Sequence, residues 1–266
     1  MAKKNSKTKP VIDVLAYNSA SWDQRGREAD IWTRAVSPKI IAAARKGDVR
    51  IVLTPQKPVP KNWFPKLKGA RVLALAGGGG QQAPILAAAG ARVTTLDASA
   101  NQLAQDKFVA EREGLTIRLE QGDFADLSRF KGASFDLIVN PASNLFAADI
   151  HPIWRECFRV LKPGGRLMAG FLNPIAFAVD SARRTARDLR IRHKLPYADL
   201  THRTPNQLAA QMRQGQSLEW SHTLTDQIGG QLAAGFRIIG FYEDTSPGDP
   251  LSAYVPDHLA TLAEKA

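Results

Sequence analysis

The 266-residue sequence has little cysteine and lacks any long uninterrupted apolar run. Its single cysteine, Cys157, excludes an internal disulfide and a cysteine-based metal cluster, which favours a reducing compartment and argues against structural zinc. Nowhere do about 18 apolar residues follow one another, and the first apolar run, residues 11–16, is interrupted by Asp13 and is too short for a secretory signal. We therefore expect a cytoplasmic protein that has no membrane span and no metal site.

Acidic residues are also scarce, since 25 of them face 36 lysines and arginines and leave a net charge of +11. Residues 1–10 contain four lysines and no acid, and such a composition predicts a disordered basic tail. A second basic stretch lies between residues 183 and 194. A basic surface attracts polyanions, so a nucleic-acid partner is one alternative, although a solvated helix face explains the same pattern.

The remaining chain predicts one α/β domain with additional segments. With 44% hydrophobic residues, the chain is long enough for one sizeable core. From residue 71 onward short apolar strands alternate with helical segments, which is typical of a parallel, doubly wound, Rossmann-like sheet. The predicted strands are Arg71–Ala76, Ala91–Leu96, Thr116–Glu120, Phe135–Asn140, Arg166–Leu172 and Phe236–Glu243. Residues 11–69 and about 173–224 interrupt this alternation, so we interpret them as cap segments of a domain that spans residues 70–266.

Several helices have recognisable ends or faces. Ser99 is a candidate N-cap for a helix that Gly114 terminates. A second helix, about residues 149–161, carries an apolar stripe that includes Cys157, which is therefore predicted to be a core residue. A third helix begins at about Thr225 and shows four-residue spacing of Leu224, Ile228 and Leu232.

Four consecutive glycines, Gly77–Gly80, follow the first strand and precede a helix. Glycine lets a ligand lie against bare backbone, and the following helix offers unpaired N–H groups. No Gly-Lys-Ser/Thr follows, and Gln82 stands where the last glycine of a G-x-G-x-x-G motif would be, so a phosphate-clamping NTPase and a dinucleotide fingerprint are both disfavoured. The loop predicts a seat for a nucleotide or nucleoside.

Two carboxylates end the neighbouring strands. Asp97 lies about 20 residues beyond the glycines, where a carboxylate can accept hydrogen bonds from ribose hydroxyls. Asp123 ends the third strand, where it could accept from an adenine amino group while Phe124 covers the ring. The alternatives are that Asp97 caps a turn and that Asp123 forms an Asx-turn.

These motifs, taken in order, resemble those of class I S-adenosylmethionine-dependent methyltransferases. The matching segments are 72–80, 96–97, 122–123, 134–138 and the Leu-Lys-Pro-Gly-Gly turn within 159–165, which is the most specific of them. The resemblance implies a seven-stranded, mostly parallel sheet whose last strand, predicted at Leu259–Lys265, is antiparallel. It also implies that S-adenosylmethionine is the cofactor and that a small molecule accepts the methyl group.

The resemblance further implies roles for individual residues. A helix carrying Tyr17 and Trp22 would fold over the cofactor, and Asn140, at the end of the fourth strand, would face the reacting methyl group. Where relatives usually have an acid and a glycine in the first motif, this sequence has Ala74 and Ala76, and Gln81 or Gln82 could compensate. The cofactor-binding residues expected on this basis are Tyr17, Trp22, Ala76, Gly77, Gly78, Gly80, Gln81, Asp97, Ala98, Gln102, Asp123, Phe124 and Asn140.

The mechanism needs an aligned acceptor and, for a hydroxyl or protonated amine, a general base. His151 lies nearest in sequence to the end of the fourth strand and is, with Asn140, the candidate catalytic residue, while His202 and His222 lie in or near the cap. Three other functions remain open: a methyltransferase acting on RNA or other nucleic acid, a protein that binds S-adenosylmethionine without turnover, and a dinucleotide oxidoreductase, which the missing third glycine disfavours.

Overall fold

The computed structural model describes residues 12–27, 31–179 and 189–266. The predicted disordered tail, residues 1–10, and half of the second basic stretch lie outside these ranges. No helix in the described ranges is long and apolar enough to cross a membrane. Within the same ranges, histidine, cysteine and acidic side chains do not gather in groups of three that could hold a metal ion.

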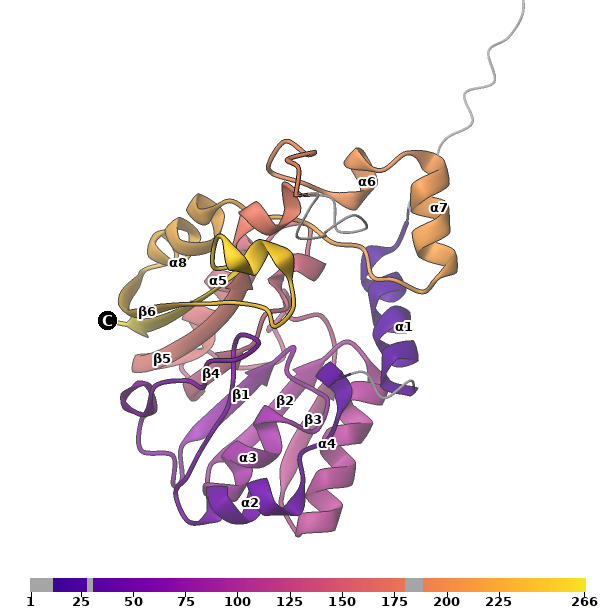
Figure 1. Ribbon diagram of the computed structural model, residues 1–266. Coiled ribbons are helices and arrows are strands. Elements are labelled where there is room, and N and C mark those ends of the chain that lie inside the picture. Colours follow the sequence, from indigo (N-terminus) through magenta and orange to yellow (C-terminus); the bar gives the residue numbers. More distant parts are fainter. Residues whose placement is uncertain (1–11, 28–30, 180–188) are drawn as a thin grey trace, which may run out of the picture.

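Within the described ranges seven strands form one sheet, in the order β3-β2-β1-β4-β5-β7-β6 (Figure 1). Strands β3 to β5 pair in parallel, whereas β7 runs antiparallel to both β5 and β6. This confirms the predicted Rossmann-like, doubly wound sheet with an antiparallel last strand. The strands are β1 (Arg71–Leu75), β2 (Arg92–Asp97), β3 (Ile117–Gln121), β4 (Phe135–Asn140), β5 (Leu161–Leu172), β6 (Phe236–Asp244) and β7 (His258–Lys265).

Helices cover both faces of the sheet, and others lie beyond its carboxyl edge (Figure 1). The helices are α1 (Val14–Arg27), α2 (Pro38–Arg45), α3 (Gln82–Ala88), α4 (Ala100–Glu113), α5 (His151–Val160), α6 (Asp199–His202), α7 (Pro205–Arg213) and α8 (Gly230–Ala233). Buried residues of α2, α3 and α4 join one apolar core, and those of α5 join the other.

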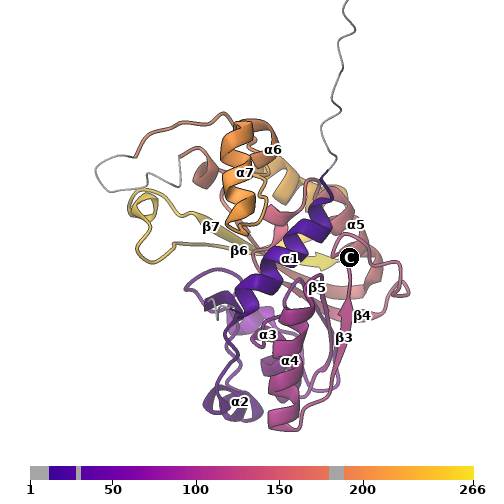
Figure 2. The same cartoon turned by 90° about the vertical axis from the view of Figure 1, so that its right-hand side faces the viewer.

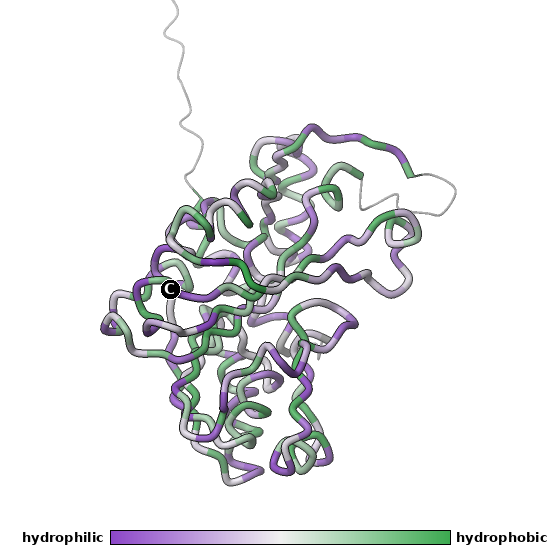
Figure 3. Tube along the Cα trace, turned by 90° about the vertical axis from the view of Figure 1, so that its left-hand side faces the viewer, coloured by the Kyte–Doolittle hydropathy of each residue, from purple (hydrophilic) through white to green (hydrophobic). Residues whose placement is uncertain are grey.

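The two cores arise from the two-residue period of the strands. Val72 and Ala74 of β1 lie in the core beneath α2, α3 and α4, while Leu73 and Leu75 lie in the core beneath α5. Successive side chains of a strand point to opposite faces, so a continuous apolar run supplies both cores at once. Figure 3 shows hydrophobic stretches running through the middle of the trace and alternating with hydrophilic ones.

The predicted ends of α4 are confirmed, as is the inward stripe of α5. The Ser99 hydroxyl accepts a hydrogen bond from the backbone N–H of Gln102 at 3.1 Å, and Gly114 adopts the left-handed conformation, with φ 63°, that a helix C-cap often requires. Cys157 is fully buried in the core, as predicted.

The region of the third predicted helix differs from a regular helix. It begins with a π-turn, Thr225–Gly229, and continues as α8. Leu224 and Leu232 are 43% and 52% exposed, whereas Gln227 and Gln231 are buried. The wider π-turn rotates the following side chains around the axis, so the four-residue apolar spacing does not mark the buried face.

Helix α1 lies beside α7 in two perpendicular views (Figures 1 and 2). The Asn18 side chain donates to the carbonyl of Leu218 at 3.0 Å and accepts from its N–H at 2.8 Å, and the Tyr17 hydroxyl donates to the carbonyl of Gln216 at 2.8 Å. Residues about 200 positions apart in the sequence therefore form one connected cover.

Candidate functional site

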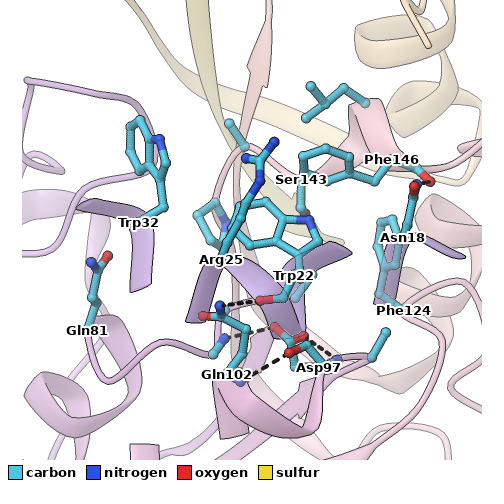
Figure 4. A pocket seen from close by; sticks show the side chains of 18 of the residues that line it. Asn18, Trp22, Arg25, Trp32, Gln81, Asp97, Gln102, Phe124, Ser143 and Phe146 are labelled. Carbon is cyan, nitrogen blue, oxygen red and sulfur yellow. Dashed lines mark hydrogen bonds between the residues drawn. The ribbon is translucent and has the colours of Figure 1, made fainter. Parts of the chain in front are cut away.

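A cavity of about 310 Å³ opens at the carboxyl ends of β1, β2 and β4, between the sheet and α1 (Figure 4). Its lower part is formed by the glycine loop after β1 and by Asp97 at the end of β2. Residues 141–143, which follow β4, and residues 52–55 form further walls. In open α/β sheets ligands bind outside this edge, at the point where the strand order reverses, which here lies between β1 and β4.

The glycine loop is held close to α4. A Cβ atom on Gly78 would lie 2.7 Å from Cβ of Gln102 and 3.0 Å from Oδ2 of Asp97, so only glycine fits there without displacement. The N–H of Gly79 donates to the carbonyl of Gln102 at 2.9 Å. This close approach leaves the backbone of Ala76, Gly77 and Gly78 as cavity wall.

The Asp97 carboxylate is the main polar feature of the lower cavity. It accepts the N–H of Gly78 at 3.0 Å on Oδ2 and the N–H of Ser99 at 2.9 Å on Oδ1. Burial raises the pKa of Asp97 to about 6, although these two N–H groups favour the charged form, and nearby Asp23 adds to the rise. Each carboxylate oxygen has a second lone pair, so the group can still accept hydrogen bonds from a bound ligand.

A second carboxylate, the fully buried Asp106 of α4, was missed by the sequence analysis. Its Oδ1 accepts the N–H of Gly80 at 2.7 Å, and Oδ2 has no hydrogen-bond partner among the described residues. Burial raises the pKa of Asp106 to about 7. The Gly80 N–H and the neighbouring Thr95 hydroxyl act in the opposite direction, although the Thr95 hydroxyl makes no regular hydrogen bond to the carboxyl group. Asp106 thus anchors the last glycine of the loop from outside the cavity. The sequence holds no signal for this role, because the role depends on the complete burial of Asp106 and on its contact with Gly80, and neither is visible in sequence.

Helix α1 covers the cavity (Figure 4). Trp22 extends into it, contacts Phe146 edge-on with ring centroids 5.3 Å apart, and lies beneath the Arg25 guanidinium at 4.8 Å. Ser19 donates to the carbonyl of Ala98 at 2.8 Å, and Asp23 accepts from the Ser99 hydroxyl at 2.6 Å. The cover is therefore attached directly to the turn that carries Asp97.

The structure brings most of the predicted cofactor-binding residues to this cavity. Those that line it are Trp22, Ala76, Gly77, Gly78, Gln81, Asp97, Ala98, Gln102 and Phe124. Ala76 adopts a left-handed conformation, with φ 46°, at the position where relatives are expected to have glycine. Further lining residues that were not predicted include Asn18, Arg25, Trp32, Thr54, Ser143, Phe146, Glu219 and His258.

Five predicted site residues are not among those that line the cavity. The Tyr17 hydroxyl donates a hydrogen bond to the carbonyl of Gln216 in the cap, and the N–H of Gly80 donates to Asp106. Asp123 accepts the N–H of Ala125 at 2.9 Å, which is the Asx-turn alternative. Asn140 is fully buried and donates to the carbonyl of Leu75 and to the Ser143 hydroxyl. His151 is half-exposed at the start of α5, 2.8 Å from Asp149.

The upper wall of the cavity comes from a segment that precedes β1. The carbonyl of Leu53 accepts the N–H of Ala142 at 3.1 Å, and a Cβ atom on Gly170 of β5 would lie only 2.1 Å from the same carbonyl oxygen. Oδ2 of Asp244 accepts the Thr54 hydroxyl at 2.7 Å and the N–H groups of Gln56 and Lys57, each at 2.8 Å. Residues 52–55 are thereby fixed over the sheet.

His258, the first residue of β7, also lines this wall and was missed by the sequence analysis. It pairs in register with Leu172, the last residue of β5. A signal was present, because the first residue of an antiparallel strand lies at the same edge as the carboxyl ends of its parallel neighbours, and the sequence there reads Asp257-His258.

The residues of the lower cavity fit an adenosyl ligand. A half-buried carboxylate with spare lone pairs suits ribose hydroxyls. The Gly78 position, where a side chain would collide with Asp97 and Gln102, leaves bare backbone for close approach. Phe124, 8% exposed, supplies an apolar ring at the same end of the cavity.

Comparisons with known proteins agree with this geometry. The sequence matches the family described as "Methyltransferase domain" over residues 73–169. It is 45% identical to a Bacillus subtilis (strain 168) protein named "Uncharacterized methyltransferase YbaJ", over 95% of this chain and 98% of that protein. A ubiquinone biosynthesis O-methyltransferase of Maricaulis maris is 30% identical, over 40% of this chain and 42% of that enzyme.

Solved structures give the same fold. An S-adenosylmethionine-dependent methyltransferase from Mesorhizobium loti superimposes with a TM-score of 0.60 at 21% identity, and the match covers 77% of this chain and 94% of that one. At this level of identity the likeness concerns the fold alone.

Proposed function

Because the chain belongs to the class I S-adenosylmethionine-dependent methyltransferase family, we propose that it transfers the methyl group to a small molecule held in the cavity beneath α1. The cofactor of this family is S-adenosylmethionine. The observation that carries the small-molecule assignment is the cover. Helix α1, which hydrogen bonds tie to residues 215–218, lies over a cavity of about 310 Å³, a volume within the range of small-ligand sites.

We assign the lower cavity to the cofactor. Asp97 would accept the ribose hydroxyls, the backbone of Gly77 and Gly78 would lie beside the methionine portion, and Phe124 would cover the adenine. Asp106 supports this assignment indirectly, since it fixes the loop through Gly80. Trp22 would exclude water from the cofactor as α1 closes over it.

We assign the upper cavity to the methyl acceptor. Its walls include the apolar residues Leu53, Pro55, Leu145, Phe146 and Leu172. These side chains favour an acceptor with substantial apolar surface, because burial of that surface would drive its binding.

When bound, S-adenosylmethionine supplies a methyl group that its sulfonium already activates. The chain's own residues then need to align the acceptor with that methyl group and to keep water out. The fixed segment 52–55 and the attached α1 serve both needs, since hydrogen bonds to Asp244, Ala98 and Leu218 hold the walls in place.

A nucleic-acid acceptor is the second candidate, and the net charge of +11 is the observation that favours it. Phosphate contacts would make RNA binding fall steeply with rising salt. Absence of any salt-dependent RNA binding, together with transfer to small molecules, would exclude it.

The experiment that tests the proposal is calorimetric titration of the full chain with S-adenosylhomocysteine. We expect binding by the wild type and a dissociation constant about 10- to 100-fold higher in Asp97→Asn, because hydrogen bonds to a charged group each contribute about 1.5–3 kcal/mol. Asp126→Asn is a matched control, since Asp126 is exposed and lies outside the cavity.

Three outcomes would contradict the proposal. Failure of the wild type to bind S-adenosylhomocysteine would refute the cofactor site. Equal affinity in Asp97→Asn and the wild type would refute the role of Asp97. Binding without methyl transfer to any small acceptor would favour a binding protein without turnover.

A further inference from the structure

The upper end of the cavity contains a histidine with one engaged and one unengaged ring nitrogen. Nδ1 of His258 lies 3.3 Å from Oδ1 of Asp257 and 3.4 Å from the Ser246 hydroxyl. Among the residues that the structure describes, the hydrogen-bond and ion-pair contacts of the His258 ring are made by Nδ1 and not by Nε2, and His258 is one of the residues that line the cavity. With a proton on Nδ1, a neutral imidazole carries its lone pair on Nε2.

Asp257 is built to hold the ring rather than to react itself. Its side chain is 3% exposed, and Oδ1 also accepts the N–H of Ser246 at 2.9 Å. Burial alone would raise the pKa of Asp257, but the hydrogen bonds from His258 and Ser246 lower it to about 2, so the group stays a carboxylate over the whole working range of pH. A permanent carboxylate behind Nδ1 fixes both the orientation and the tautomer of the imidazole.

Three acidic residues of the described ranges lie near His258 or on the same cavity. Asp257 precedes it on the same strand, Asp244 is its register partner on β6, and Glu219 lines the cavity from the cap. Asp244 is engaged by Thr54, Gln56 and Lys57. Asp257 is therefore the carboxylate in direct contact with the His258 ring, with Nδ1 and Oδ1 3.3 Å apart.

We propose that His258 is the proton acceptor of methyl transfer, that Asp257 is its positioning residue, and that the acceptor group is a phenolic hydroxyl. The inference rests on the proposed function. A base works best on an acid of similar pKa, and a phenol, with a pKa of about 10, is far better matched to an imidazole than an aliphatic alcohol is. The apolar wall of Leu53, Phe146 and Leu172 suits the ring that carries such a hydroxyl.

The proposed step is balanced without any further reactant. The phenolic O–H bond breaks as its proton passes to Nε2 of His258, and the oxygen forms a bond to the methyl carbon. The S–CH₃ bond breaks, and its electron pair remains on sulfur, which leaves S-adenosylhomocysteine as a neutral thioether. The imidazolium then releases its proton to water.

The test uses the full chain with S-adenosylmethionine and three probes, phenol, catechol and 2-naphthol. We expect methyl transfer to at least one probe, with kcat/KM falling at low pH as His258 becomes protonated. His258→Gln should lower kcat/KM by about 10²- to 10⁴-fold and remove the acidic limb of the profile, while the dissociation constant of S-adenosylhomocysteine stays within about twofold. Asp257→Asn should displace that limb, which a purely structural role would not do.

A second readout does not depend on turnover. Diethyl pyrocarbonate reacts with neutral imidazole, so peptide mass spectrometry should detect modified His258 in the free protein and protection by S-adenosylhomocysteine together with 2-naphthol. An unmodified His258, or one that these ligands do not protect, would contradict an accessible base in the cavity.

The outcomes separate this inference from the proposed function. If S-adenosylhomocysteine does not bind, both fail. If it binds but no phenol is methylated, or if His258→Gln retains the wild-type rate, the inference is overturned while the cofactor site stands. The same loss of rate in His151→Gln, with His258→Gln unaffected, would assign the base to α5 and would also overturn it.

Discussion

Asp106→Asn should change how stability depends on pH. Asp106 is completely buried, and its carboxyl holds the glycine loop through the N–H of Gly80. Its pKa is about 7 in the folded protein, compared with about 4 in an unfolded chain. The unfolded chain therefore releases this proton at a lower pH than the folded protein does, and stability falls as pH rises from about 4 through 7.

The magnitude follows from the two pKa values. Between pH 5 and pH 8 the ionisation of Asp106 should lower the free energy of unfolding by about 2–3 kcal/mol. Asparagine has nearly the same shape, keeps an oxygen that can accept the Gly80 N–H, and does not titrate. The free energy of unfolding of the variant, relative to that of the wild type, should therefore rise by about 2 kcal/mol as pH rises from 5 to 8.

Urea denaturation at pH 5, 6, 7 and 8 measures this difference, because the free energy of unfolding extrapolates linearly with denaturant. Subtracting the two proteins at each pH cancels the titrating groups that do not interact with Asp106, whereas Asp97, whose charge raises the pKa of Asp106, contributes to the difference in the same direction. A difference that stays constant from pH 5 to pH 8 would refute the reasoning, since it would mean that Asp106 ionises equally easily in both states.

Three further predictions concern the same region. Gly78→Ala should destabilise the fold by about 1–3 kcal/mol, because the new Cβ would lie 2.7 Å from Gln102, whereas Gly77→Ala, whose Cβ meets only Ala74 at 3.5 Å, should stay within about 0.5 kcal/mol in urea titrations. Ala76→Gly and Ala133→Gly should each raise Tm by about 1–2 °C, because both alanines have positive φ. Only Ala76→Gly should change the affinity for S-adenosylhomocysteine, because Ala76 lines the cavity and Ala133 does not. A lower Tm in both variants would argue against backbone strain. Asn18→Ala should destabilise the protein by about 2 kcal/mol and speed amide exchange in residues 215–220, because it leaves both backbone groups of Leu218 unpaired; unchanged exchange there would show that α1 and the cap are independent.

The sheet could be predicted because each strand carries its own signal. A buried parallel strand reads as a short apolar run between turn residues, and β4 begins and ends at the predicted residues. Strand β5 begins earlier than predicted, at Leu161, because the Lys-Pro-Gly-Gly segment is absorbed as an irregularity in its pairing with β4. The glycine loop and Asp97 were likewise found from local spacing alone.

The rest of the site depends on contacts that no local pattern encodes. Asn18 and Leu218 meet across 200 residues through backbone groups, which leave no periodicity in the sequence. Asp106 reads as an ordinary polar residue of an amphipathic helix, although it points inward. In the π-turn region Leu224 and Leu232, which the four-residue spacing places on one helix face, are exposed, whereas Gln227 and Gln231 are buried. The reason is that the turn departs from the 3.6-residue period.

The attachment of Thr54 to Asp244 has a consequence for biosynthesis. The two residues are 190 positions apart, so a ribosome adding about 5–20 residues per second needs about 10–40 s to make the second after the first. During that interval residues 52–55 have no Asp244 to hold them over the sheet, although β1, the glycine loop and β2 are made within the first quarter of it. A nascent chain should thus be able to assemble its nucleoside seat well before it has a chamber for a second substrate, and the two compartments mature in that order.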